Sequence, residues 1–528
     1  MLESISAFLA PPHIQHVLAT LRGLFCVACL LLLVRCVFHF APYRLGRKPR
    51  LWLFPILFAA GAFAILAYQA TWQLGGYLRP DFVRFMERYN PRPDNIAHRL
   101  IRGDIRDRNG ERLAYTETDG SGRRVYPFEN ATAHVVGFRH PSEGLTGMEG
   151  ASDDLLSGYR RRSFRTELKE AGAFALRDER HVGTNVVLTI DSKLQLRACA
   201  LFQRNFPGGR GAAVALDPRD GSILALYSHP SFDPNRFDRR LNIDPASPLL
   251  NRALHGRYPA GSTFKTVVAG LMYDCQVPLT LACPADGYYP PGARRPIRDH
   301  EYYAYERKGL AWPGFGTLDL PTALAKSSNT YFAHGGVLCG TSAFNALADR
   351  LGFNERLPIY SNETAMVSCQ KGHIPRLGKA EKRELSQLCI GQGTLLVTPL
   401  HMAMIAGAIA NGGTMMTPRL TPDTPPSVRS QVFAASTAKK VRAAMRKVVQ
   451  TGTGRKADLP GHNVCGKTGT AQNPGGADHG WFICFAPEEA PEIAVAVVVE
   501  NAGFGSSAAL PIAAGILEAY FAGKEEGR

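Results

Sequence analysis

The longest runs of hydrophobic residues in this chain lie near its N-terminus. Leu51–Trp72 carries no charged side chain over about 20 positions, which is the length that a helix needs to cross a bilayer. Leu18–Phe40 is also apolar, although Arg22 and Arg35 interrupt it, and arginines near the ends of a span can reach the lipid headgroups. The pattern predicts a membrane anchor with two transmembrane helices within residues 1–75.

A short basic segment joins the two apolar stretches. It contains Arg44, Arg47, Lys48 and Arg50, and basic loops beside membrane helices remain in the cytoplasm. The part of the chain after Trp72 is therefore expected outside the cytoplasmic membrane. A cleaved signal peptide is the alternative, but no small-residue cleavage site follows an apolar stretch of suitable length.

The rest of the chain changes character near residue 185. Residues 76–184 are rich in charge, with short apolar runs and turn sequences such as Asn109-Gly110, which predicts a small module containing β-strands. Residues 185–528 show stronger alternation and helical periodicity. In that part we expect strands at Val186–Ile190, Ala212–Leu216, Ser222–Tyr227 and Glu492–Glu500, a hairpin turn at Asp220-Gly221, and helices at Leu400–Ala410 and Leu510–Phe521.

The composition indicates a folded protein and suits an acidic partner. Hydrophobic residues make up 45% of the 528 residues and charged residues 20%, which is typical of globular domains and argues against disorder. The 61 basic residues exceed the 45 acidic ones and give a formal charge of +16. This excess suits nucleic acid, anionic lipid or a carboxylate-bearing polymer, and charge alone does not choose among them.

The eleven cysteines form two groups. Cys26, Cys29 and Cys36 lie in the first apolar stretch. A compartment outside the cytoplasm permits disulfides among the rest, but sequence does not give their connectivity. Cys275 and Cys283 are close enough to close a short loop, and free buried thiols are the alternative for the others. The eight are Cys199, Cys275, Cys283, Cys339, Cys369, Cys389, Cys465 and Cys484, and no C-x-x-C pair among them favours zinc.

A candidate nucleophile stands at the start of a predicted helix. Ser262 follows Gly261 and precedes an apolar run with helical spacing. Lys265 comes three residues later, on the same face of that helix. A serine hydroxyl becomes a good nucleophile when a base removes its proton, and a buried lysine with a lowered pKa can be that base. The helix N-terminus would also direct backbone N–H groups at a developing oxyanion.

The same spacing occurs a second time, so S-x-x-K by itself carries little weight. Ser436 and Lys439 form the second copy and lead into a helical sequence, in which Ser436 is an expected N-cap. Ser262 differs because two further motifs follow it in order, Ser327-Ser328-Asn329 and Lys467-Thr468-Gly469-Thr470.

Each of the two later motifs has a structural interpretation of its own. Ser327 and Asn329 are two residues apart and could face one cleft, but alone they would be better explained as a loop. The Lys467–Thr470 sequence fits an edge strand, on which Gly469 would let a substrate backbone approach while Lys467 and Thr468 face a carboxylate. In the order found here, the three motifs together predict acyl transfer through a serine.

The ordered S-x-x-K, S-x-N and K-T-G set resembles that of the penicillin-binding proteins, and of their class B in particular. The resemblance extends from the region of Asn90 to the C-terminus. It implies an α/β penicillin-binding transpeptidase domain, β-lactamase-like in fold, over residues 185–528, with an N-terminal β-rich pedestal module over residues 76–184 and a membrane anchor. Further matching segments are Arg102–Gly110 with Leu113-Ala114, Gly144–Glu149, Tyr258–Lys265, Ile390–Gly393 and Thr398–Leu400.

The resemblance also implies a reaction and a role for each site residue. A peptidoglycan D,D-transpeptidase would join stem peptides that end in D-Ala-D-Ala through an acyl group on Ser262, and β-lactams would acylate the same serine. No metal or organic cofactor is implied; the implied partner is a membrane glycosyltransferase of the SEDS family, and the implied location is the bacterial inner membrane, with the catalytic domain in the periplasm. The implied roles are Lys265 as base, Ser327 and Lys467 as proton relay, Asn329 on the substrate amide, Thr468, Gly469 and Thr470 on its carboxylate and backbone, and the N–H groups of Ser262 and Thr470 on the oxyanion.

Two features depart from the pattern of that family. Its members usually have one membrane span, whereas two are predicted here, and the extra helix could serve a membrane partner. Basic and aromatic residues alternate in Tyr288–Trp312, which could indicate nucleic-acid binding. Outside the cytoplasm a solvated loop near the cleft is the better interpretation, and no nucleic acid is expected.

Three other functions compete with this one. A β-lactamase would need a water-activating carboxylate between the second and third motifs, and Glu363 beside Asn362 does not fit that role. A β-lactam sensor or a catalytically silent scaffold would share the fold and differ in its deacylation rate. A bifunctional class A enzyme would carry a glycosyltransferase domain, for which residues 76–184 are too few.

Overall fold

The computed structural model describes residues 100–117, 119, 122–140, 143–158, 181–360, 366–473 and 475–526, together with residue 35 and residues 60–61, 63–65 and 67–68. The chain divides into two units, Met1–Pro93 and Asp94–Arg528. Most of the two predicted membrane segments lies outside the described residues, as do the basic segment between them, Cys26, Cys29, Cys36, Asn362 and Glu363. Among the positions that are described, no helix is long and apolar enough to cross a membrane.

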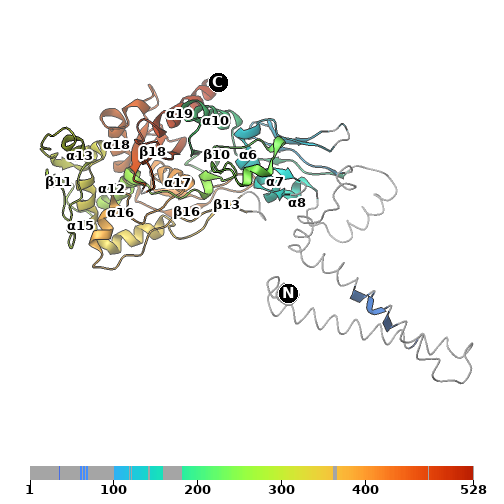
Figure 1. Ribbon diagram of the computed structural model, residues 1–528, viewed down its shortest axis with the longest axis horizontal. Coiled ribbons are helices and arrows are strands. Elements are labelled where there is room, and N and C mark those ends of the chain that lie inside the picture. The colour runs from blue at the N-terminus through green and yellow to red at the C-terminus, as the bar shows by residue number, and fades with distance from the viewer. Residues whose placement is uncertain are drawn as a thin grey trace, which may run out of the picture. The chain divides into compact units, whose positions relative to one another are not determined.

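A five-stranded antiparallel sheet forms the centre of the second unit (Figure 1). Almost every residue in its strands is buried, because helices cover both faces. The hairpin predicted at Asp220-Gly221 is confirmed, since it joins the first two strands of the sheet. In the order of the sheet, the strands are β10 (Ile223–His229), β9 (Gly211–Leu216), β19 (Ile493–Val499), β18 (His479–Ala486) and β17 (Cys465–Ala471).

The sheet separates two apolar layers. Val495 of β19 packs with α10 (Ser192–Asn205) and α19 (Ala509–Glu526) on one face. The next residue, Ala496, belongs to the larger core with α17 (Pro399–Ala410) on the other face. Successive side chains point to opposite faces because the side-chain period of a strand is two residues. A strand covered on both faces is therefore apolar at every position.

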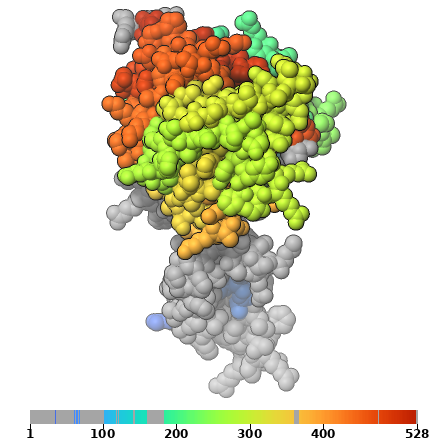
Figure 2. All heavy atoms as spheres, turned by 90° about the vertical axis from the view of Figure 1, so that its left-hand side faces the viewer, coloured from blue at the N-terminus to red at the C-terminus, as the bar shows by residue number. Residues whose placement is uncertain are grey.

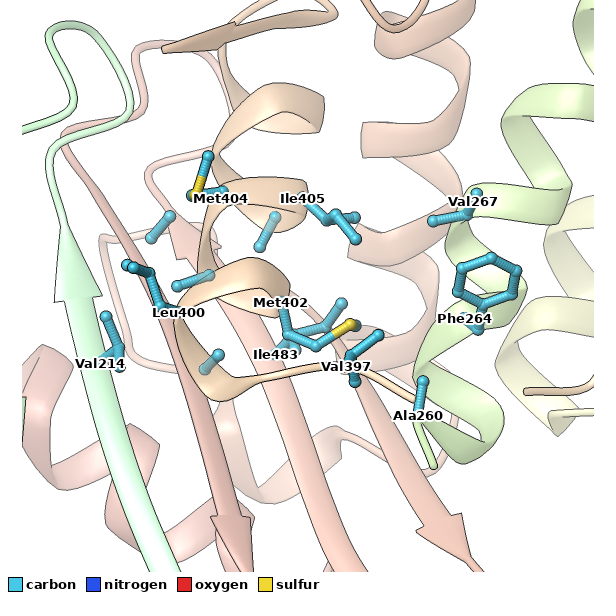
Figure 3. Packing of buried hydrophobic residues seen from close by; sticks show 14 of the residues in the cluster. Val214, Ala260, Phe264, Val267, Val397, Leu400, Met402, Met404, Ile405 and Ile483 are labelled. Atoms are coloured by element: carbon cyan, nitrogen blue, oxygen red, sulfur yellow. The ribbon is translucent and has the colours of Figure 1, made fainter. Parts of the chain in front are cut away.

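Helix α17 is the centre of the larger core, and all of its residues are buried. Apart from His401 it is apolar around its circumference, which is expected of a helix surrounded by other elements. Figure 3 shows α17 between the strand that carries Val214 and the segment that carries Phe264 and Val267. That segment includes the start of α12 (Lys265–Asp274). Helix α17 and the start of α12 therefore belong to one continuous core on this face of the sheet.

The remaining sequence predictions of secondary structure are confirmed in part. The helices predicted at Leu400–Ala410 and Leu510–Phe521 correspond to α17 and α19, and the strand predicted at Glu492–Glu500 corresponds to β19. The strand predicted at Val186–Ile190 is shorter, because β8 covers only Val186–Val187. It pairs in parallel with β2 (Ile105–Arg106) in a four-stranded sheet of order β4-β3-β2-β8, which also contains β3 (Arg112–Thr116) and β4 (Arg124–Val125).

A buried ion network joins the separate segments of this N-terminal part. Glu149 lies in the short helix α7 (Gly147–Ala151) and is fully buried. Arg102 Nε donates to Glu149 Oε2 at 2.7 Å, and Arg124 Nε donates to Glu149 Oε1 at 2.6 Å. Burial alone would raise the pKa of Glu149, but the attraction of the two guanidinium groups lowers it. Arg102 also pairs with Asp153. Because Arg102 and Glu149 belong to two different segments that resemble family motifs, these segments meet at the network.

A second buried carboxylate connects the four-stranded sheet to α10. Asp107 is completely buried, and its Oδ2 accepts hydrogen bonds from Ser192 N at 3.1 Å and from Ser192 Oγ at 2.7 Å. Its Oδ1 accepts from the N–H groups of Asn109 and Glu111 at 2.8 and 2.9 Å. The Asp107 side chain thus stabilises the predicted turn at Asn109-Gly110 and also accepts hydrogen bonds from the first residue of α10.

All eight cysteines of the described part are free thiols. The loop that Cys275 and Cys283 could close is therefore not closed. Burial raises the pKa of both the Cys275 and the Cys339 thiol. Cys283 Sγ accepts from Ser328 Oγ at 3.8 Å.

We expect the Glu149→Gln substitution to destabilise the protein strongly. It leaves two buried guanidinium groups facing a neutral side chain, and loss of one partner of a buried ion pair costs about 3–5 kcal/mol of unfolding free energy. Glu355→Gln is the matched control, because Glu355 also pairs with an arginine, Arg429, but its side chain is 67% exposed. That control should lose less than about 1 kcal/mol. Chemical unfolding of the purified chain measures both values, and equal losses would contradict the importance of the network.

Candidate active site

The first motif lies where a tight turn enters α12. Gly261 has a φ of +56°, and residues Gly261–Phe264 form a 3-10 turn, η6, that continues directly into the helix. Ser262 is half-buried, whereas the residues of α12 from Lys265 to Met272 are all buried. The predicted helix start at Ser262 is confirmed. The hydroxyl of Ser262 therefore reaches the surface from a rigid, buried helix.

The Lys265 amine is completely buried and contacts polar atoms of the first and second motifs. Its Nζ donates to Ser262 Oγ at 3.0 Å, to Ser327 O at 2.6 Å and to Asn329 Oδ1 at 2.7 Å. Burial lowers the pKa of Lys265 to about 7, although attraction to Asp299 and then to Glu301 opposes this shift. A large fraction of the amine is consequently neutral near pH 7, and a neutral amine can accept a proton from Ser262.

The second motif joins two helices. Ser327 ends α14 (Leu320–Lys326) with a φ of +59°, a left-handed conformation that is uncommon outside glycine. Ser328 is the N-cap of α15 (Asn329–Arg350), and its Oγ accepts from Tyr331 N at 3.1 Å. Asn329 Nδ2 donates to Arg298 O at 3.0 Å, which holds its amide beside Lys265. The junction between the two helices thus brings Ser327 and Asn329 into one cluster with Lys265.

The third motif lies on β17, which is the edge strand that the sequence predicts. Lys467 is completely buried, and its Nζ donates to Ser327 Oγ at 2.9 Å and to Thr468 O at 2.8 Å. Burial, together with repulsion from Lys265, holds the pKa of Lys467 well below its ordinary range. Ser327 Oγ also accepts from Lys265 Nζ at 3.4 Å, so this hydroxyl lies between the two lysines.

On β17, Thr468 and Thr470 point to one side and Gly469 to the other, because side chains alternate along a strand. Thr468 is 7% exposed, and its hydroxyl hydrogen-bonds to that of Thr453 at 2.5 Å, while Thr470 is half-buried. A Cβ on Gly469 would lie 2.8 Å from Thr263 Cγ2 and 3.0 Å from Trp481 Cβ. The absence of a side chain at Gly469 therefore lets η6 pack closely against the strand.

Close backbone packing fixes the turn that carries Ser262. Gly261 N donates to Gly391 O at 2.8 Å, and a Cβ on Gly391 would lie 1.9 Å from Gly261 O. A Cβ on Gly261 would in turn lie 2.5 Å from Thr470 O. Two glycine-containing segments and the edge strand therefore meet directly behind the serine. This arrangement explains the glycine at position 391.

The second S-x-x-K copy is separate from this cluster. Ser436 is exposed in the first turn of α18 (Ala435–Thr451), and Lys439 is exposed as well. The prediction that Ser436 caps this helix is wrong, because the N-cap position belongs to Ala434 and has no side-chain hydrogen bond. The Ser436 hydroxyl lies two residues beyond the cap position, too far along the helix to accept hydrogen bonds from the free N–H groups of its first turn.

Tyr288–Trp312 was expected to be a solvated loop near the cleft, but the sequence did not indicate that one of its residues is buried against the site. Arg294 and Arg295 are exposed, as expected of a solvated loop, but Asp299 is 2% exposed and contacts the second motif. Helix α13 (His300–Glu306) follows it, on the side of the molecule that Figure 2 views. In the described part of the chain, no three His, Cys, Asp or Glu side chains are grouped so that they could hold a metal ion.

Comparison with known proteins covers both parts of the second unit. Residues 211–518 match the family described as penicillin binding protein transpeptidase domain, and residues 102–186 match the penicillin binding protein A dimerisation domain. The chain is 34% identical over 458 residues to a protein of Mycobacterium tuberculosis named peptidoglycan D,D-transpeptidase PbpA, covering 79% of this chain and 88% of that protein. It is 32% identical to the Acinetobacter baumannii protein named peptidoglycan D,D-transpeptidase MrdA, covering 73% and 64%.

Solved structures agree with the sequence relatives. A ceftriaxone acyl-enzyme complex of penicillin-binding protein A from M. tuberculosis matches with a TM-score of 0.70 and 31% identity, covering 80% of this chain and 99% of that one. A complex of Pseudomonas aeruginosa PBP2 matches with a TM-score of 0.64 and 29% identity, covering 80% and 96%.

We expect Gly391→Ala to displace the turn that carries Ser262. The new Cβ would meet Gly261 O, in addition to the strain of a left-handed alanine at a φ of +77°. Gly412→Ala is the control, because Gly412 has a φ of +61° and open space around its Cβ position. The control should lose about 1 kcal/mol of unfolding free energy from backbone strain, and Gly391→Ala about 2 kcal/mol more from overpacking. Thermal unfolding distinguishes them, and equal melting temperatures would show that the turn tolerates displacement.

Proposed function

Because this chain belongs to the penicillin-binding protein family, and within it to class B, we propose that its second unit is a serine D,D-transpeptidase of peptidoglycan. Its substrate would be a stem peptide that ends in D-Ala-D-Ala, and β-lactams would acylate the same serine. The observation that carries the proposal is the pairing of Ser262 Oγ with a buried Lys265 amine at 3.0 Å. That pair supplies a nucleophile and a base at neutral pH.

In the acylation step, the neutral Lys265 amine takes the proton of Ser262 as the oxygen attacks the carbonyl carbon of the D-Ala-D-Ala bond. A C–O bond to Ser262 forms, and the C–N bond to the terminal D-alanine breaks after a proton reaches its nitrogen. Lys467 and Ser327 would deliver that proton, because Ser327 Oγ lies between the two lysine amines. The N–H groups of Ser262 and Thr470 would bind the oxyanion.

The remaining residues of the motifs would bind the substrate. Asn329 would hold the amide of the stem peptide, because its own amide is fixed between Lys265 and Arg298 O. The edge strand β17 would receive the extended peptide through its free side. Thr468 and Thr470 would bind the terminal carboxylate, and Gly469 would keep the strand close enough to η6 for the peptide to reach Ser262.

Residues 1–75 would form a membrane anchor, residues 76–184 a pedestal and residues 185–528 the transpeptidase domain. The support is the apolar sequence of Leu18–Phe40 and Leu51–Trp72. We infer an inner-membrane location with the catalytic domain in the periplasm, and a glycosyltransferase of the SEDS family as the membrane partner. Accessibility of the second unit to protease in intact spheroplasts tests the location, and protection of that unit would refute it.

Substitution of the nucleophile gives the direct test. Ser262→Ala should abolish labelling by a fluorescent penicillin, because alanine has no hydroxyl oxygen to which the acyl group could bond. Ser436→Ala, in the second S-x-x-K copy, should label as the unchanged protein does. The same pair should differ in forming cross-linked peptides from lipid-linked glycan strands, assayed with and without a polymerase partner. Undiminished labelling of Ser262→Ala would show that another residue is the nucleophile.

The rate of acylation should rise with pH through about 7. Lys265 acts as a base only when it is neutral, and its pKa of about 7 places that change near neutrality. Acylation should therefore be slow below this pH, where the amine carries a proton, and should reach a plateau above it. Second-order rate constants with a chromogenic or fluorescent β-lactam, measured from acid to mildly alkaline pH, give the profile. An acidic limb near pH 10, the ordinary value of a lysine, would contradict the assignment of Lys265 as base.

A further inference from the structure

Asp299 is a buried carboxylate in which only one of the two oxygens has hydrogen-bond donors. Its Oδ1 accepts from Ser328 Oγ at 2.9 Å and from Thr330 N at 3.1 Å. Its Oδ2 is also buried but has no hydrogen-bond partner among the described residues. A buried carboxylate oxygen without a donor is unfavourable, and such a group in a folded protein calls for an explanation.

The charges around Asp299 suggest that explanation. No lysine or arginine within the described ranges forms a salt bridge with Asp299. The neighbouring Arg298 instead points to α13, the helix that follows it, where its guanidinium group lies 4.0 Å from the centre of the Tyr302 ring. Lys265 and Asp299 both bond the Ser327–Thr330 segment, and the charge of Asp299 raises the pKa of the Lys265 amine.

We propose that Asp299 is a positioning residue of the transpeptidase site, which holds the Ser327–Thr330 junction through its Oδ1 and supplies the buried negative charge that balances the Lys265 amine. The inference rests on the proposed function, because it assigns Asp299 a part in the reaction of Ser262. Asp299 itself touches neither Ser262 nor the position of the substrate.

The structural part of this role follows from the two donors. Ser328 and Thr330 flank Asn329, so a single carboxylate oxygen fixes the backbone on both sides of the residue that faces Lys265. Ser327 immediately precedes them in its left-handed conformation. A residue in such a conformation persists only where its surroundings hold it. Asp299 is one of the groups that hold this junction.

The electrostatic part follows from the groups that face the Lys265 amine. These are Ser262, Ser327 and Asn329 in direct contact, the amine of Lys467, and the carboxylates of Asp299 and Glu301. Burial lowers the pKa of Lys265, and Asp299 raises it more than Glu301 does. Without Asp299 the amine would become a weaker base, further from the value near the working pH at which a general base is most effective.

A neutral replacement of the same shape separates the two parts of the role. Asp299→Asn keeps a carbonyl oxygen for Ser328 and Thr330 but removes the negative charge. The acidic limb of penicillin acylation should move to lower pH by roughly one unit, and the plateau rate should fall because the base is weaker. Glu301→Gln should move the limb in the same direction by less.

Two controls make the shift specific. Ser328→Ala removes one donor to Asp299 and should slow acylation at every pH without moving the limb. Glu306→Gln removes one negative charge from the exposed C-terminal end of α13. It should change neither the limb nor the plateau, because solvent screens that charge. Thermal unfolding of each variant shows whether it is folded, and Asp299→Glu, which restores the charge, should return the limb toward that of the unchanged protein if it folds.

The outcomes separate this inference from the proposed function. If penicillin does not acylate the unchanged protein at all, the proposed function fails. If the unchanged protein is acylated but folded Asp299→Asn has the same limb, or only a uniform loss of rate, Asp299 does not act on Lys265 and the inference is wrong. A shift of the limb in Asp299→Asn that Glu306→Gln does not reproduce supports it.

Discussion

The structure of the site depends on the burial of one amine, that of Lys265. A lysine without solvent must find hydrogen-bond acceptors inside the protein, and here they come from Ser262, Ser327 and Asn329. Those acceptors belong to the turn before α12 and to the junction of α14 with α15. The amine therefore holds together segments that are distant in sequence, and the same burial that requires these contacts makes the amine a base near neutral pH.

Lys467 extends this constraint to the sheet. Its amine is buried on the edge strand and donates to the Ser327 hydroxyl, which already faces Lys265. Two buried amines around one hydroxyl cannot both hold a full charge easily, because each disfavours the protonated form of the other. One proton moving between them through Ser327 changes the total charge of the site little. The left-handed backbone of Ser327 is what places the hydroxyl between them, so strain at one residue serves both lysines.

Local sequence patterns predicted those parts of the structure that local geometry determines. The spacing of Ser262 and Lys265 predicted one helical face, and the apolar run of Leu400–Ala410 predicted a buried helix, because both depend only on the period of a helix. The edge position of the Lys467 strand was also predicted. The contact between Ser327 and Lys467 was expected only from the resemblance of the three motifs to a family, since nothing in either segment specifies the other. The N-cap at Ser436 was predicted wrongly, because cap and first-turn positions differ by only a residue or two.

Asp299 was missed for a physical reason. Its sequence surroundings, with Arg294 and Arg295 exposed nearby, are those of a solvated loop, and no periodic pattern identifies one buried carboxylate among exposed charges. Only the folded chain brings it against Ser328 and Thr330. A buried oxygen with no donor is unfavourable for stability, yet its charge opposes the effect of burial on Lys265. The pKa of Lys265 would then be set by two opposing effects, the burial of its amine and the charge of the buried Asp299 carboxylate. Altering either one would change the pH at which Ser262 reacts.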